Sequence, residues 1–195
     1  MLRYIIVNGT HGATRHGDFD APGSKFLATL DNLAEPVCRE QPYCWSTALE
    51  GIDGDNIEWL VAGANLFQYA VPPLCPDRRV KSEELLVIAF SHGVQVALYA
   101  FSMGLKGRFI SVNPPIREDM LAVARDARHN MVSWTNLYGN WKDTWAIFGA
   151  IRDGNWGLRR QYPENFCTRQ VLVPGGHGAA LREDKYYPMW KEWVR

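Results

Sequence analysis

The most informative part of the chain is the stretch Glu-Leu-Leu-Val-Ile-Ala-Phe-Ser-His-Gly at residues 84–93. After Glu84, the six residues 85–90 form a continuous apolar run rather than an alternating one, so 84–90 is predicted to be a strand buried on both faces of a parallel sheet. The chain beyond this run predicts a helix, because Val94, Ala97, Leu98 and Phe101 fall on one helical face before Gly104. The stretch therefore predicts a sharp strand-to-helix turn that presents Ser91 at the end of a central strand.

Strand-like and helix-like runs alternate on both sides of this stretch from one end of the chain to the other. This alternation predicts an α/β fold of three layers, with a mainly parallel sheet of about six strands and helices on both faces. We expect strands at 3–8, 43–47, 84–90, 108–113, 131–138 and 169–173. We expect helices at 25–38 with Ser24 as the N-cap, at 56–70 after a capping box of Asp55 and Glu58, at 94–101, at 117–128 and at 179–194.

Length and composition narrow the class of protein. The 195 residues are 47% apolar and 22% charged, which is typical of one folded domain, 1–195, rather than of a disordered chain. Lys plus Arg and Asp plus Glu both number 21, so no basic excess is available to neutralise the backbone of a nucleic acid. Neither a membrane-spanning run nor a signal-peptide core is found, and the four cysteines form no CxxC pair, so we expect a cytoplasmic protein with reduced thiols.

Three strand ends carry polar residues suited to nucleophilic catalysis. Ser91 follows the strand at 84–90, Asp143 follows the strand at 131–138, and His177 lies in the Gly-Gly-His-Gly loop after the last strand. Ligands of open parallel sheets bind outside the carboxyl ends of the strands, so these side chains should meet at one edge. Their order, Ser then Asp then His, is the order expected of a hydrolase triad on this architecture.

Each of these residues also has a simpler interpretation. Ser91 could serve as the N-cap of the helix that follows it, and His177 could be a surface-loop histidine. Asp143 could be a loop carboxylate, and Asp153 competes with it for the role of the acid. We favour Asp143 because it lies five residues past the predicted strand end, whereas Asp153 follows a helix-compatible stretch at 144–151.

These motifs resemble those of the α/β-hydrolase superfamily. The resemblance rests on Ala89-Phe90-Ser91-His92-Gly93, on the loop from Gly139 to Asp143, on Gly175-Gly176-His177-Gly178 and on Ile5-Ile6-Val7-Asn8-Gly9-Thr10-His11-Gly12. The chain departs from the usual pattern at Asn8, where many members have His, and at Val94, where many have a second Gly. Ala89 takes the place of the first elbow glycine, as it does in small lipases of the superfamily.

The motif implies a serine hydrolase, most simply a carboxylic ester hydrolase of the esterase or lipase type that requires no cofactor and no metal. His177 would take the proton of the Ser91 hydroxyl as general base, and Asp143 would orient the imidazole. The amide of His92, directly after the nucleophile, would stabilise the negative oxygen of the intermediate. The resemblance implies that the amide of Thr10 is the second donor of this oxyanion hole.

The segment between the acid and the base predicts the nature of the substrate. We expect residues 144–168 to form a small cap over the pocket. Trp141 and Trp145 flank the acid and are candidate pocket residues, although tryptophans more often pack in a core. Aromatic walls favour an apolar acyl or alcohol group, so the expected partner is a small-molecule ester.

Two other classes of function compete with this interpretation. A metal-dependent hydrolase could use His11, His16, Asp18 and Asp20, but these residues show no helical His-x-x-x-His pair and no His-x-His core. A non-catalytic binding protein could share the α/β-hydrolase fold, because a fold does not by itself establish an activity.

Overall fold

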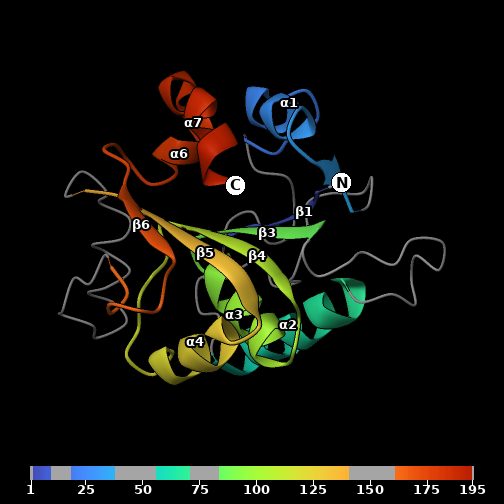
Figure 1. Ribbon diagram of the computed structural model, residues 1–195, viewed down its shortest axis with the longest axis vertical. Helices are drawn as coiled ribbons and strands as arrows, with labels where there is room; N and C mark the ends of the chain where they lie inside the picture. Colours follow the sequence, from blue (N-terminus) through green and yellow to red (C-terminus); the bar gives the residue numbers. More distant parts are fainter. Residues whose placement is uncertain (1, 10–18, 38–55, 71–83, 141–160, 195) are drawn as a thin grey trace.

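A six-stranded parallel sheet forms the centre of the computed structural model (Figure 1). The structure describes residues 2–9, 19–37, 56–70, 84–140 and 161–194. The strand order is β2-β1-β3-β4-β5-β6, and all five pairings are parallel. This architecture confirms the predicted α/β fold with a parallel sheet of about six strands.

Strand β3 (Leu85–Phe90) lies in the interior of the sheet, as the continuous apolar run predicts. All six of its residues are buried, and it pairs with β1 (Arg3–Val7) on one side and β4 (Gly107–Val112) on the other. Beyond β4 follow β5 (Met131–Tyr138) and the edge strand β6 (Arg169–Leu172). The buried centre of the sheet therefore leads directly into the turn at Ser91.

Helices cover both faces of the sheet and define three layers (Figure 1). Helices α2 (Asn56–Ala70), α3 (Gly93–Ser102) and α4 (Leu121–Arg128) pack on one face. Helix α1 (Lys25–Asp31), α6 (Ala179–Arg182) and α7 (Tyr187–Trp193) cover the other. Two separate apolar cores result, one on each side of the sheet. None of the described helices is long and apolar enough to cross a membrane.

The first predicted helix is shorter than the apolar spacing over 25–38 suggests. Ser24 is its N-cap, as predicted, and its hydroxyl oxygen accepts a hydrogen bond from the Leu27 amide at 3.2 Å. The helix ends at Asp31, where the Asn32 side chain donates to the Ala28 carbonyl at 2.8 Å and the last turn tightens. The chain then forms β2 (Glu35–Pro36), a two-residue edge strand that the sequence did not indicate. The predicted strand at 43–47 lies outside the described residues.

The predicted C-terminal helix over 179–194 is in fact divided into three pieces. Helix α6 is followed by the 3₁₀ helix η4 (Asp184–Tyr186) and then by α7. Pro188 occupies the first turn of α7, and a proline inside one continuous helix would clash with the carbonyl four residues earlier. The indole Nε1 of Trp190 donates to the Ala180 carbonyl at 2.9 Å, which folds α7 back against α6.

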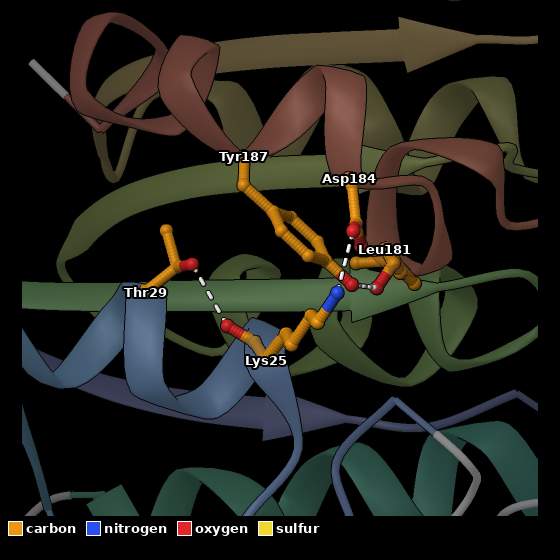
Figure 2. A network of polar contacts seen from close by, with 5 residues as sticks. All are labelled: Lys25, Thr29, Leu181, Asp184 and Tyr187. Atoms are coloured by element: carbon orange, nitrogen blue, oxygen red, sulfur yellow. Dashed lines mark hydrogen bonds and ion pairs between the residues drawn. The ribbon is translucent and has the colours of Figure 1, made fainter.

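An ion pair joins this C-terminal unit to α1, beside a hydrogen bond within the unit (Figure 2). Lys25, at the start of α1, pairs with Asp184 of η4, and the Tyr187 hydroxyl donates to the Leu181 carbonyl at 3.3 Å. The ion pair is solvent-exposed and contributes little stability by itself. Its place shows that α1 and the segment 181–187 share one side of the sheet, next to the loop that carries His177.

The described part of the predicted cap, residues 161–168, packs beside the sheet. Tyr162 is buried, and its ring centroid lies 4.6 Å from that of Trp134 in β5. Phe166 stacks on Tyr162 with centroids 6.3 Å apart. Residues 144–160 lie outside the described residues.

Candidate active site

The candidate site lies where the order of the strands reverses. From β1 the chain runs outward to β2 and then returns to β3 on the other side of β1. The helices that follow β1 and β3 pack on opposite faces, so the carboxyl ends of these two strands form the switch point at which open parallel sheets bind their ligands. Gly9 follows β1 and Ser91 follows β3, so both residues stand at this switch point.

Ser91 occupies a strained turn rather than the cap of a helix. Its φ is 52°, a left-handed conformation that a residue with a side chain seldom adopts. Its amide donates to the Val112 carbonyl at 3.0 Å, which continues the β3–β4 ladder through the turn. The N-cap of α3 is His92, with no side-chain cap bond, so the interpretation of Ser91 as the N-cap is wrong. Strain of this kind concentrates at functional sites.

Two glycines allow the backbone to come close around Ser91. A Cβ placed on Gly93 would lie 2.4 Å from the Asn8 carbonyl oxygen and 2.5 Å from that of Val7. A Cβ placed on Gly9 would lie 2.8 Å from the Ser91 Cβ and 3.4 Å from its Oγ. The end of β1 therefore lies directly against the nucleophile turn, and any larger residue at either position would separate the two.

The side chain of His92 contacts the α2 side of the turn. Its ring stacks on Trp59 with centroids 5.6 Å apart and an interplanar angle of 19°. The Arg117 guanidinium lies 5.3 Å from the centroid of the same Trp59 ring. The His92 ring therefore packs against α2, and the role of the His92 amide at Ser91 stays a prediction.

His177 lies on the opposite side of the turn. Its ring centroid is 4.8 Å from that of Phe90, the residue directly before Ser91. The loop that carries it follows β6 and includes Gly175 at φ 151° and Gly178 at φ 86°, conformations that favour glycine. The structure therefore brings the predicted nucleophile and the predicted base to the same end of the sheet.

Asn8 and Asp20 form a buried polar pair at the two ends of the segment that follows β1. The Asn8 side-chain nitrogen donates to the carboxylate of Asp20, and both residues are 1% exposed. This bond joins the two ends of the segment 9–19, which contains the predicted oxyanion residue Thr10. Asp20 was considered above as a metal ligand. Among the described residues, no group of three His, Cys, Asp or Glu side chains could hold a metal ion.

Several predicted site residues lie outside the described residues. They are Thr10, Trp141, Asp143 and Trp145, together with the alternatives His11, His16, Asp18 and Asp153. Strand β5 ends at Tyr138, as predicted, and the description continues to Asn140, three residues before Asp143. The roles assigned to these residues stay predictions.

Sequence reasoning assigned no individual role to three residues at the site. Phe90 was quoted only within the buried strand and the motif around Ser91, yet its ring contacts both His177 and Phe19. Arg182 carried no signal in the sequence, because nothing in its spacing distinguishes it from a helical surface cation. Gly9 did carry a signal, since a glycine directly after the first strand of a parallel sheet allows close approach at the carboxyl edge.

The parallel sheet, its helices on both faces and the strained Ser91 turn define an α/β-hydrolase fold, and known structures agree. The crystal structure of TT1662 from Thermus thermophilus matches with a TM-score of 0.57 and 17% identity, covering 99% of this chain and 87% of that chain. The crystal structure of esterase PE8 matches with a TM-score of 0.53 and 14% identity, covering 100% and 91%. No protein-family model and no curated protein matches the sequence. At these identities the likeness shows the fold.

Proposed function

We propose that this protein is a serine hydrolase that cleaves carboxylic esters through an acyl-enzyme on Ser91. The observation that carries the proposal is the Ser91 turn itself, with φ 52° at the carboxyl end of the central strand and glycines on both sides. A fold that required only a helix start at this point would not need the left-handed conformation. The likeness to esterase PE8 supports a hydrolase of this fold.

In this mechanism the Ser91 Oγ attacks the carbonyl carbon of the ester while His177 takes its proton. The negative oxygen that forms accepts hydrogen bonds from the amides of His92 and Thr10. The His92 amide is favoured for this task because it stands at the N-terminus of the ten-residue helix α3, where the helix dipole stabilises negative charge. His177 then gives the proton to the leaving alcohol, and water releases the acid by the reverse steps.

Asp143 orients the His177 ring and stabilises its charged form in this proposal. Trp141 and Trp145 are the candidate walls of a pocket for an apolar acyl or alcohol group. The chain needs no cofactor and no metal for such chemistry, because the triad and the oxyanion hole are sufficient for ester hydrolysis.

A series of p-nitrophenyl esters of increasing acyl length tests the proposal, with Ser91→Ala measured beside the wild type. We expect hydrolysis by the wild type and a fall in kcat of about 10⁴-fold or more in Ser91→Ala. Ser102→Ala is the matched control, because Ser102 lies at the far end of α3 and should keep wild-type turnover. Ser91 does not cap α3, so both variants should keep the wild-type Tm.

Labelling with a fluorophosphonate probe separates this enzyme from a non-catalytic protein of the same fold. We expect one label per chain on wild type and Ser102→Ala, and none on Ser91→Ala. A Ser91→Ala variant that keeps a tenth of wild-type turnover would exclude Ser91 as the nucleophile. A wild type that neither labels nor hydrolyses any ester of the series would favour the binding protein.

A further inference from the structure

Arg182 holds the loop that carries His177 from the C-terminal side. Arg182 is the last residue of α6, and its Nη1 donates to the His177 carbonyl oxygen at 3.0 Å. The same guanidinium lies over two aromatic rings, with its Cζ 5.9 Å from the centroid of Phe90 and 5.6 Å from that of Phe19. A planar guanidinium can donate along its edge while its face rests on a ring, a combination that lysine does not offer.

Arg182, His177 and Phe90 each contact the other two. Arg182 binds the backbone of His177, the Arg182 guanidinium lies over Phe90, and the Phe90 ring lies 4.8 Å from the His177 ring. Phe90 directly precedes Ser91 in the chain. Arg182 thus contacts both the backbone that carries the imidazole and the aromatic ring against which the imidazole lies.

The loop also leaves room for this arginine. A Cβ on Gly178 would lie 2.8 Å from the Arg182 Nη1 and 3.3 Å from the Phe90 Cζ. The φ of 86° favours glycine at position 178, and a side chain there would displace the guanidinium from its place beside the loop. With Gly175, Gly176 and Gly178 around it, His177 has little restraint from its own loop and depends on contacts from outside.

We propose that Arg182 is a positioning residue for His177 and that it fixes the imidazole for proton transfer without touching the substrate. The inference rests on the proposed function of His177 as the general base. Its physical basis is that proton transfer requires the ring to stay within hydrogen-bond reach of the serine, so a looser ring lowers turnover without weakening substrate binding.

A second contact to the same loop provides the control. The Tyr186 hydroxyl donates to the Pro174 carbonyl, so Tyr186 also holds the loop, but at a residue that precedes Gly175 in the chain rather than at His177 itself. Tyr186→Phe removes that bond and leaves the contacts of His177 in place. A general loosening of the loop should appear in both variants, whereas loss of ring position should appear in the arginine variant alone.

The test compares kcat, KM and Tm of Arg182→Met, Arg182→Lys and Tyr186→Phe on a p-nitrophenyl ester. We expect Arg182→Met to lower kcat about tenfold with KM within twofold of the wild type. Arg182→Lys should recover part of the loss, because the lysine ammonium keeps the charge and can still donate to the His177 carbonyl but has no planar face to lie on the rings. Tyr186→Phe should keep kcat within twofold, even if its Tm falls further than that of Arg182→Met.

An NMR measurement makes the outcome independent of activity. The imidazole signal of His177, assigned by its loss in His177→Gln, should broaden at least twofold in Arg182→Met and stay sharp in Tyr186→Phe. An unchanged signal in Arg182→Met, or equal losses of kcat in Arg182→Met and Tyr186→Phe, would overturn the role of Arg182. If the His177 signal broadens in Arg182→Met but the wild type hydrolyses no ester, Arg182 does position His177, and the proposed hydrolase function is refuted.

Discussion

Strands β3 and β6 each end in a turn that carries a candidate catalytic side chain, but the two turns are held by different means. All six residues of β3 are buried, and its turn is fixed by backbone close approaches at Gly9 and Gly93. Strand β6 is the last strand of the sheet, its four residues are half-buried or exposed, and Leu172 is 49% exposed. In the loop beyond it, the side chains of Arg182 and Tyr186 donate to backbone carbonyls.

A catalytic side chain can thus be held in position by close backbone packing, as at Ser91, or by side-chain contacts to a loop, as at His177. A backbone close approach tolerates almost no change in volume, so a larger residue in the nucleophile turn should destabilise the fold. A loop held by side chains loses one contact at a time, so the base should lose function in steps while the fold survives.

The largest effect is expected at the residue that orients the base. Asp143→Asn should lower kcat by about 10⁴-fold and leave the Tm unchanged, because an amide stabilises the wrong tautomer of His177. Asp153→Asn should be nearly normal, since the stretch at 144–151 would take Asp153 away from the sheet end. Kinetics of both variants on the same ester, with circular dichroism as a check of folding, decide between them. The reverse ranking would assign the acid to Asp153.

The second prediction concerns the backbone around the nucleophile. Gly93→Ala should lower the free energy of unfolding by about 3 kcal/mol, because the added Cβ would meet the Asn8 and Val7 carbonyl oxygens at 2.4 and 2.5 Å. Gly176→Ala is the matched substitution in the His177 loop. Nothing lies within 4 Å of a Cβ there, so its stability should stay within about 0.5 kcal/mol of the wild type.

Urea unfolding measures both glycine variants on the same scale. Equal stabilities would contradict the distinction between a turn fixed by its backbone and a loop held by side chains. A Gly93→Ala protein that is insoluble agrees with the prediction, provided that Gly176→Ala is folded and soluble.

The same difference explains how much of the molecule could be predicted from its sequence. The centre of the sheet was predictable because burial on both faces forces a continuous apolar run, as in β3, and a sharp turn forces small residues. Strand β2 was not predictable, because two residues at an edge, one of them Pro36, leave no periodicity to detect. The division of the C-terminal helix was signalled by Pro188, but the apolar spacing on both sides of it concealed the break.

In the candidate site, too, local sequence features could be recognised and contacts between distant segments could not. Ser91 and His177 were proposed because each follows a strand end among small residues, Ala89 and Gly93 around Ser91 and glycines on both sides of His177, which are local features of the sequence. Phe90 and Arg182 were missed because their roles depend on contacts between segments that are distant in the chain, such as the 5.9 Å between the Arg182 Cζ and the Phe90 ring. A single sequence shows which residues a turn requires but does not show which side chain of another element supports it.

The smallest expected effect concerns the burial of the segment that precedes β6, measured by the reactivity of the Cys167 thiol. Burial raises the pKa of the Cys167 thiol, two residues before β6, to about 12, although the charge of Arg128 opposes the shift. Because the thiolate is the reactive form, Cys167 of the folded protein should react with iodoacetamide at pH 8 at least tenfold more slowly than in urea.

The pH dependence of this reaction distinguishes a closed segment from an open one. In urea the rate should level off as the pH rises past about 9, the ordinary pKa of a thiol, because the thiolate is then fully formed. In the folded protein the raised pKa means that the thiolate fraction, and with it the rate, should keep rising through pH 10. Peptide mass spectrometry follows Cys167 separately from the other thiols. If the two profiles coincide, the segment before β6 opens freely, and side-chain contacts would then be too weak to hold the base side of the site.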